Sequence, residues 1–345
     1  MKKFWAIVLG LGLALAQGVL GGGQGHSAFV GQGVLWLWGW NYDGQLGDGT
    51  FRNALRPIRL LEGVLGVAVG NLHTLVLLPD GRLWAFGANE KGQLGDGSLA
   101  TKAKPVEVFT RAKGAAAGYW HSLLLSQEGQ VYATGSNEEG QLGDGTRQGR
   151  NRFGRVEGLE RIRGIAAGYF HSLAWTETGE LFAWGANFSG QLGTGTVESL
   201  LRPVKVLEGV VTAAAGGSFS AALLRDGRVV VAGLDSASFR PVEGIPRAKA
   251  LAAGRAHLLI LGEDGRVYAL GENEAGQLGD GTQEGRLEAR PVPGLEGAVA
   301  VGAGDAHSLV LLADGSLWAF GANQMGQLGD GTREGRLRPV RVRFP

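Results

Sequence analysis

The amino-acid sequence predicts an all-β fold, a seven-bladed β-propeller with four antiparallel strands per blade. The prediction rests on an internal repeat, an unusual glycine content and a strand-and-turn pattern within each repeat. A pair of residues that ends in glycine recurs seven times along the chain. The intervals between the pairs are 48, 48, 50, 48, 38 and 50 residues, a period typical of propeller blades. The seven occurrences are Trp38-Gly39, Phe86-Gly87, Thr134-Gly135, Trp184-Gly185, Ala232-Gly233, Leu270-Gly271 and Phe320-Gly321.

The composition agrees with a folded chain of many short strands. Glycine supplies 62 of the 345 residues, far above its usual share of ~7%. Hydrophobic residues make up 44% of the chain, which is enough for a packed core. Glycine at this density between β-branched and aromatic runs indicates strands joined by tight turns.

The first two segments of each repeat have the pattern of inner strands. The first contains small residues, as at 115–118 and 251–254, which suits an innermost strand where backbones crowd around the axis. The second is apolar on both faces, as at 121–125 and 307–312. That pattern is expected for a strand covered on both sides by neighbouring blades.

Turn residues mark the third and fourth segments. An Asp-Gly pair typical of two-residue hairpins precedes the third segment, which ends at the repeated glycine. A long loop then leads to a fourth segment that begins at a proline, as expected for an outer strand that loses no ladder hydrogen bond. The hairpin pairs are Asp80-Gly81, Asp226-Gly227, Asp264-Gly265 and Asp314-Gly315, and the prolines are Pro57, Pro105, Pro203, Pro241, Pro291 and Pro339.

The repeats account for the chain from about Val19 to its end, where the last fourth strand is expected over Val340 to Phe344. We therefore expect residues 17–345 to form a single propeller domain. Seven whole repeats without a linker favour a closed ring, because an open stack of blades leaves a hydrophobic face at each end.

Residues 1–16 have the three parts of an export signal. Two lysines precede an apolar stretch, and Ala14-Leu15-Ala16 provides the small residues of a cleavage site. Cleavage leaves Gln17 first and predicts a secreted or periplasmic protein without an integral membrane segment. The alternative is an uncleaved anchor, but glycines interrupt a run that is short for the ~20 residues of a spanning helix. The chain has no cysteine, so stability must come from packing.

The charge balance weighs against polyanionic partners. Without residues 1–16, which carry two lysines and no acid, the chain has 31 basic and 32 acidic side chains, a net charge of −1. A balance so close to zero provides no field that attracts nucleic acid or an anionic membrane. We expect neither as the main partner.

A ten-residue loop motif follows the third segment in six of the seven repeats. Residues 89–98 read Asn-Glu-Lys-Gly-Gln-Leu-Gly-Asp-Gly-Ser, and residues 323–332 read Asn-Gln-Met-Gly-Gln-Leu-Gly-Asp-Gly-Thr. Together with a Gly-x-x-His turn and the Trp-Gly strand end, this motif resembles the regulator of chromosome condensation repeat. The resemblance covers essentially the whole chain after residue 16.

The resemblance implies a seven-bladed propeller that serves as an interaction module. One eukaryotic type of the family exchanges nucleotide on the Ran GTPase and binds chromatin, and a secreted bacterial type inhibits β-lactamases by covering their active site. This chain departs from the exchange-factor type through its export signal and its even repeat intervals, which leave no room for a nucleotide-displacing insertion. The secreted bacterial type is the better match.

Six histidines occupy the same place in six repeats, and Phe219 occupies that place in the fifth. Equivalent positions in separate blades are too dispersed to supply the convergent ligands of a zinc site. We therefore expect no metal, and structural histidines that bond to a backbone group of their own turn. The six are His26, His73, His121, His171, His257 and His307.

The loop motif also repeats one aspartate and one glutamine, which we expect to satisfy loop backbone groups. A single aspartate between glycines is too few oxygen ligands for calcium. No Ser-His-Asp constellation stands outside the repeat, so we expect no catalytic residues, no cofactor and no enzyme activity. The repeated residues are Asp48, Asp96, Asp144, Asp280 and Asp330, with Gln45, Gln93, Gln141, Gln277 and Gln327.

Function is sought where the repeats differ, because the fold places the same demands on every blade. Aromatic residues replace small or polar ones in the first turn and in the long loop, which emerge on one face of a propeller. Trp and Tyr are frequent interface anchors, so we interpret these rings as a partner surface; the alternative is that they plug the channel or wedge between blades. The predicted partner-binding residues are Trp40, Tyr42, Tyr119, Trp120, Tyr169, Phe170 and Phe188.

The fifth repeat is ten residues shorter than the 48-residue repeats, and residues 234–239 replace its loop motif. The shortening predicts a notch that a partner's loop enters, or else a neutral loss in a surface loop. Arginines also cluster before some fourth strands, where we expect a solvated rim or a weak site for an acidic partner. They are Arg147, Arg150, Arg152 and Arg155, and Arg333, Arg336 and Arg338.

These observations favour an exported, monomeric, non-catalytic scaffold that engages a protein partner through an aromatic loop face. Three alternatives stay open. The first is a β-lactamase-inhibitor-like protein, and the second is a propeller lyase or hydrolase that uses the central pocket. The third is a structural module of the cell envelope.

Overall fold

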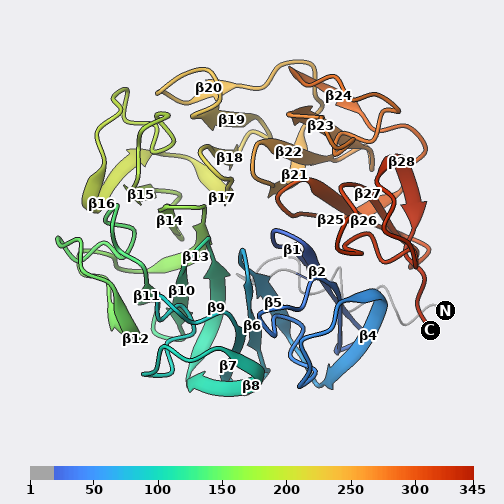
Figure 1. Cartoon of the computed structure of the whole chain (residues 1–345). Helices are drawn as coiled ribbons and strands as arrows, with labels where there is room; N and C mark the ends of the chain where they lie inside the picture. Colours follow the sequence, from blue (N-terminus) through green and yellow to red (C-terminus); the bar gives the residue numbers. More distant parts are fainter. Residues whose placement is uncertain (1–18) are drawn as a thin grey trace.

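The computed structural model describes residues 19–345, so the predicted signal segment lies outside the described residues. Twenty-eight strands form seven four-stranded antiparallel sheets arranged in a ring, and no helix occurs among the described residues (Figure 1). Within each sheet the strands follow the order of the chain, from the axis to the rim. The predicted seven-bladed propeller is confirmed.

Each blade takes four consecutive strands, so that blade 1 contains β1 to β4 and blade 7 contains β25 to β28. The strand bounds are β1 (Leu20–Gly22), β2 (His26–Gly31), β3 (Val34–Gly39), β4 (Ala54–Glu62), β5 (Gly66–Val69), β6 (His73–Leu77), β7 (Leu83–Gly87), β8 (Lys102–Phe109), β9 (Ala112–Ala117), β10 (His121–Ser126), β11 (Val131–Gly135), β12 (Arg150–Arg155), β13 (Ile162–Ala167), β14 (His171–Thr176), β15 (Leu181–Gly185), β16 (Leu200–Leu207), β17 (Val210–Ala215), β18 (Ser220–Leu224), β19 (Val229–Ala232), β20 (Arg240–Pro241), β21 (Ala248–Ala253), β22 (His257–Gly262), β23 (Val267–Gly271), β24 (Arg286–Pro291), β25 (Ala298–Ala303), β26 (His307–Leu312), β27 (Leu317–Gly321) and β28 (Arg336–Arg341).

The second strand of each blade is the most deeply buried. Every residue of β10, β14 and β22 is buried. These strands lie between the innermost and third strands of their own sheet and are covered on both faces by adjacent blades, which explains their continuous apolar sequence.

The outer strands begin earlier than predicted. Prolines 57, 105, 203 and 339 lie inside β4, β8, β16 and β28, three residues after each strand begins. In each case the proline falls within an irregularity of the pairing with the third strand, where a missing N–H costs no ladder bond. The last strand is therefore β28, and the predicted strand over Val340 to Phe344 is wrong.

The ring closes through contacts between blades 7 and 1, since each blade is built from its own four strands. The Asp305 N–H donates to the Gly23 carbonyl at 3.0 Å. Phe344 follows the last strand and packs edge-on against Trp36 of β3, with ring centroids 5.2 Å apart. The end of the chain therefore seals the junction at which the ring begins.

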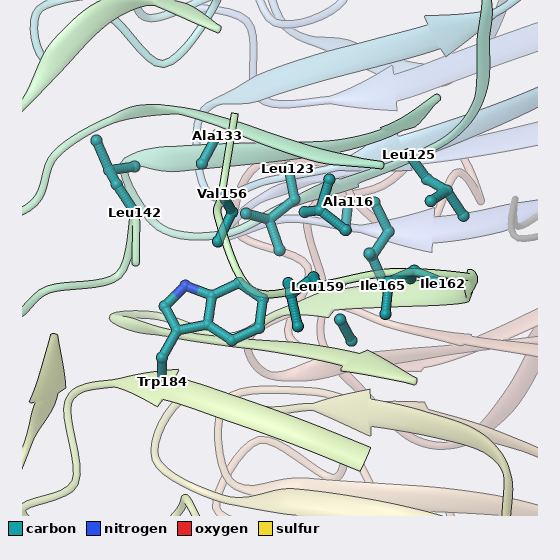
Figure 2. Close-up of a cluster of buried hydrophobic side chains, with 12 residues drawn as sticks. Ala116, Leu123, Leu125, Ala133, Leu142, Val156, Leu159, Ile162, Ile165 and Trp184 are labelled. Atoms are coloured by element: carbon teal, nitrogen blue, oxygen red, sulfur yellow. The ribbon is translucent and has the colours of Figure 1, made fainter. Parts of the chain in front are cut away.

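The hydrophobic core consists of clusters between neighbouring blades. In the cluster between blades 3 and 4, aliphatic side chains of β9, β10, β11 and β13 pack together with the indole of Trp184 on β15, which lies at one end of the cluster (Figure 2). Leu142, from the loop of blade 3, lies in the same cluster and is fully buried. The loop motif thus places a leucine from one blade into the core that it shares with the next.

Candidate interaction face

A ring of buried side chains links the blades just below the face that carries the first turns. Each repeated histidine, through Nε2, hydrogen-bonds to a Ser or Thr hydroxyl at the start of the second strand in the next blade. The pairs are His26–Thr74 (3.1 Å), His73–Ser122 (2.8 Å), His121–Ser172 (2.9 Å), His171–Ser220 (2.9 Å), His257–Ser308 (2.9 Å) and His307–Ser27 (2.8 Å). The partner expected from the sequence, a backbone group of the same turn, is therefore wrong.

The hydroxyl of each pair donates its only hydrogen to the backbone carbonyl of the loop glutamine in the preceding blade. Ser122 Oγ, for example, donates to the Gln93 carbonyl at 2.6 Å. The histidine Nε2–H must then be the donor to the hydroxyl. Burial lowers the pKa of His73 to about 3 and that of His171 to about 4, so the imidazoles stay neutral at pH 7. These groups hold the ring together and are not free for acid–base chemistry.

The loop motif is a closed hydrogen-bonded unit. In blade 2, the Leu94 N–H donates to Asn89 Oδ1 at 3.0 Å, and the Lys91 N–H donates to Gln93 Oε1 at 3.0 Å. Asn89 Nδ2 donates to Asp96 Oδ1 at 3.1 Å. The repeated glutamine and aspartate thus satisfy the loop, as expected, while the central role of the asparagine was not identified from the sequence.

Four aromatic residues of the first turns in blades 3 and 4 form one cluster, which we call the aromatic quartet: Tyr119, Trp120, Tyr169 and Phe170. The Tyr119 ring lies 4.7 Å from both Trp120 and Tyr169, centroid to centroid. The Trp120 and Phe170 rings are 6.0 Å apart. All four side chains are partly exposed. The quartet's residues belong to the β9–β10 and β13–β14 turns of two neighbouring blades (Figure 1).

The quartet divides into an inner and an outer pair. Tyr119 and Tyr169 line a central cavity of 310 Å³ that the innermost strands of the blades surround, whereas Trp120 and Phe170 do not. Lys91, from the loop of blade 2, places its ammonium 5.4 Å from the Trp120 ring centroid and 3.3 Å from Glu138. Trp120 of the outer pair therefore contacts a charged residue of the neighbouring loop.

The other predicted site residues do not join the quartet. Trp40 and Tyr42 form a separate edge-on pair in blade 1, with centroids 6.1 Å apart. Tyr42 is 61% exposed and Phe188 is 68% exposed. Phe188 takes part in none of the ring contacts found within residues 19–345. The first-turn residues thus make one cluster, whereas the loop residues form a separate pair in blade 1 and a single exposed ring in blade 4.

Polar residues from three blades meet opposite the inner tyrosines. The Tyr169 hydroxyl of blade 4 hydrogen-bonds to the Asp305 carboxylate of blade 7 across the cavity mouth. Burial raises the pKa of Asp305, while the hydrogen bond from Tyr169 and the charge of Arg255 act in the opposite direction. Arg255 in turn pairs with Glu272 at 2.6 Å.

The cluster of Tyr169, Asp305 and Arg255 is better suited to binding than to proton transfer. Burial raises the pKa of Tyr169, and the Asp305 charge adds to the effect, so the phenol remains a hydrogen-bond donor. The sequence signal for the cluster was the residue after the glycine of the Gly-x-x-His turn, which is charged in blades 6 and 7, as Arg255 and Asp305. Only the geometry of the ring brings them to Tyr169.

The predicted arginine clusters are largely paired within the chain. Arg150 lies 2.5 Å from Asp144, and Arg336 lies 2.9 Å from Asp330. Among residues 19–345, no group of three or more His, Cys, Asp or Glu side chains is arranged to hold a metal ion. The same part of the chain has no helix of the length and hydropathy needed to cross a bilayer.

The junction between blades 5 and 6 differs from the other six. Phe219 replaces the histidine of blade 5, and Leu258 replaces the hydroxyl residue of blade 6. Both are buried and pack in one hydrophobic cluster. The loop that supplies the glutamine carbonyl elsewhere is absent here, so an apolar contact replaces a hydrogen-bonded pair that has no acceptor.

The predicted extent of the loop replacement, residues 234–239, is too long. The Gly195 N–H of the blade 4 loop donates to the Ala237 carbonyl at 2.8 Å, as the corresponding loop glycines do in other blades. Residues 236–239 therefore hold the place where a fourth strand begins, and only Leu234 and Asp235 stand in for the loop. Leu234 lines a cavity of 570 Å³ between blades 5 and 6, which we call the notch.

Comparisons with known proteins agree with this architecture. The sequence profile of the RCC1-like domain matches residues 11–239, and profiles of the regulator of chromosome condensation (RCC1) repeat match residues 248–277, 298–327, 264–311 and 314–345. Segments of the E3 ubiquitin-protein ligase HERC2 from human and mouse are 40% identical over 21% of this chain. The match spans only 2% of the length of these relatives.

Solved structures show the same fold. Human WBSCR16 superimposes with a TM-score of 0.82 at 24% identity, covering 90% of this chain and 94% of that one. Yeast RCC1 (Prp20), in a structure bound to Kap60, gives a TM-score of 0.81 at 21% identity, covering 94% of this chain and 85% of that one. Since the RCC1-like profile covers more than half of the sequence and RCC1 repeats cover most of the rest, this chain belongs to the regulator of chromosome condensation (RCC1) family.

Proposed function

We propose that this chain is an exported, non-catalytic binding scaffold that engages a protein partner through the face carrying the aromatic quartet. The observation that carries the proposal is a group of four partly exposed, mutually contacting rings that the repeat does not require. The equivalent positions of blade 1 are Gln24 and Gly25, and those of blade 5 are Gly217 and Ser218. Aromatic clusters of this kind are frequent anchors of protein interfaces.

The neighbours in the family support a role in protein binding. Yeast Prp20 is described in complex with Kap60, and a second study concerns its binding to Gsp1p and histones. For this chain, the near-zero charge outside residues 1–16 favours a protein partner over nucleic acid. The histidines support no catalytic role, because each is buried in a hydrogen bond to the next blade. We propose a secreted or periplasmic monomer.

The test begins by capturing partners from the exported fraction and identifying them by mass spectrometry. The affinity of the purified partner is then measured for the wild type and for a variant that combines Trp120→Ala and Phe170→Ala. We expect at least a tenfold loss of affinity, since hot-spot truncations cost ~2 kcal/mol or more. The melting temperature should change by only a few degrees, because both rings are partly exposed.

The matched control is Val204→Ala, which truncates an exposed apolar residue on the outer strand of blade 4. This variant should bind as the wild type does. Equal affinity of the double variant and the control would contradict the aromatic face as the binding surface. N-terminal sequencing of the exported protein tests the signal segment, and we expect the sequence to begin at Gln17.

A further inference from the structure

The notch between blades 5 and 6 is an open place with an apolar floor. Phe219, Leu234 and Leu287 line it, and Arg255 and Glu272 stand at its rim. Leu287, near the start of β24, is 58% exposed. The leucines at the corresponding point of filled junctions are less exposed, since Leu337 is 37% exposed and Leu55 and Leu201 are partly buried.

The next junction shows what normally fills this place. Between blades 6 and 7, the loop glycine Gly276 lies directly over Leu337, the counterpart of Leu287. The Gly281 N–H donates to the Leu337 carbonyl at 2.8 Å. Leu278 from the same loop is fully buried between the two blades, in one cluster with Phe320. A filled junction therefore receives a covering glycine, a backbone donor and a buried leucine.

The notch lacks these three contributions, and the residues around it are adapted to the missing loop. Phe219 and Leu258 replace the polar pair that needs a loop carbonyl. Glu288 stands where the corresponding residues next to loops are Arg152, Arg202 and Arg338, whose guanidinium groups lie against a loop glycine. The polar pair and the basic residue that contact the loop in other junctions are thus replaced here. The apolar surface of Leu287 and its backbone carbonyl are still available to a binding partner.

A second copy of this chain is a poor donor for the vacant place. The leucines of its six loops, such as Leu46 and Leu278, are fully buried within their own molecule. Offering one of these loops to a neighbour requires opening a blade junction. The occupant is therefore a loop of a different protein.

We propose that the notch binds a glycine-containing turn of the protein partner. The turn seats an apolar side chain against Phe219, Leu234 and Leu287 and donates a backbone N–H to the Leu287 carbonyl. Glu288 selects against an acidic residue in the turn, because the loop aspartate Asp96 of blade 2 lies opposite Arg152, the counterpart of Glu288, in an antiparallel backbone bridge. The inference rests on the proposed function in one respect: the turn belongs to the partner.

The test uses a synthetic probe and so needs no identified partner. The probe is a cyclised peptide with the sequence of residues 273–282 in which the aspartate is replaced by asparagine. Binding to isotope-labelled full-length protein is followed by NMR and by calorimetry. We expect saturable shifts at the amides of Leu287 and Glu288. Absence of saturable shifts at these amides, or shifts confined to the aromatic quartet, would overturn the proposal.

Three altered peptides separate the contributions. Replacing the peptide's leucine with alanine should weaken binding at least tenfold, because burial of that side chain is lost. Sarcosine at the position of Gly281 removes the N–H donor and should weaken binding about fivefold. Restoring the aspartate should weaken binding about two- to fivefold, since it faces Glu288. Equal affinities across the set would show nonspecific adsorption and overturn the proposal.

Two variants of the protein test whether the peptide binds in the notch. Replacing Leu234 and Asp235 with a second copy of residues 272–285 supplies the missing loop, and this variant should lose peptide binding while its melting temperature is kept or raised. Leu287→Asp should also abolish binding. Its control is Leu99→Asp, because Leu99 is likewise 58% exposed and lies in the loop of blade 2. Peptide binding that survives in the loop-filled variant would refute the notch as its site.

Binding of the peptide in the notch can be tested independently of the aromatic quartet. The Trp120→Ala, Phe170→Ala double variant should bind the peptide with unchanged affinity. A peptide that fails to bind overturns the notch and leaves the aromatic face standing. A double variant that keeps full affinity for the captured partner overturns the aromatic face and leaves the notch standing.

Discussion

The junction between blades 2 and 3 and the junction between blades 5 and 6 solve the same packing problem in different ways. In the first, His73, Ser122 and the Gln93 carbonyl form a buried relay that joins two blades and a loop. In the second, Phe219 packs in a cluster with Leu258, and no loop is present. The comparison shows that the relay is a unit, because the loss of one member is accompanied by the loss of the others.

The physical reason is the cost of a buried polar group without a partner. A hydroxyl that loses its carbonyl acceptor, or an imidazole that loses its hydroxyl, costs ~1–3 kcal/mol in a buried site. Apolar residues at both positions avoid that cost. The two kinds of junction therefore differ in their response to pH, to exchange of residues and to restoration of the loop.

The largest expected effect is the pH dependence contributed by the six polar junctions. The folded pKa values of the histidines are lowered to about 3 or about 4, below the unfolded value of 6.5. Their stabilising contribution is complete above pH 6.5 and is lost as the pH falls, at ~1.4 kcal/mol per histidine per pH unit. We expect the urea midpoint to fall steeply between pH 6.5 and pH 4.5.

A variant with His73→Phe and Ser122→Leu converts one polar junction to the apolar type. Its stability should fall about one-sixth less steeply with pH than that of the wild type, since one of six protons no longer binds on unfolding. The carboxylates with lowered pKa values act below about pH 4 and do not obscure this range. A midpoint that stays constant from pH 7 to pH 5 would contradict neutral, buried histidines.

The next effect tests the apolar junction. Phe219→His places an imidazole opposite Leu258, where no hydroxyl accepts its N–H, and should lower the free energy of unfolding by about 2–3 kcal/mol. Adding Leu258→Ser supplies the acceptor and should recover about 1 kcal/mol, although the serine still lacks a loop carbonyl. Denaturant unfolding of the two single variants and the double variant measures this coupling. Strictly additive changes would show that the two residues do not act as a pair.

The sequence was sufficient for those features that repeat along the chain. The seven glycine positions predicted seven blades, and the Asp-Gly pairs predicted the hairpins. The loop glutamines and aspartates were correctly expected to bond loop backbone. These features depend on interactions within about ten residues, so their signal is local and is repeated in each blade.

Features that depend on the ring could not be predicted in the same way. The hydrogen bond from His73 crosses to Ser122, 49 residues away, and a single repeat contains no sign of that direction. Tyr169 meets Asp305 only because the ring brings blades 4 and 7 to opposite sides of a narrow channel. The separation of the aromatic residues into a quartet, a pair and a single ring likewise follows from the positions of the blades.

The smallest expected effect is a change in stability at the rim of the notch, where Glu288 replaces the basic residue of the filled junctions. Glu288→Arg restores the basic residue found beside the loops, but in the wild-type chain it has no loop to contact. Glu288 is exposed and pairs only with Arg290 at 2.8 Å, so its replacement should change the free energy of unfolding by less than about 0.5 kcal/mol.

In the variant that carries the extra loop at residues 234–235, the same substitution should stabilise the protein by about 0.5–1 kcal/mol. There the guanidinium has a loop glycine to lie against and a loop aspartate opposite it, as Arg152 has Gly97 and Asp96. The measurement is the difference between the two backgrounds in urea unfolding, which cancels any effect that the arginine has by itself. An equal change in both backgrounds would mean that the arginines of the filled junctions are independent of the loops beside them, and that Glu288 is unrelated to the missing loop.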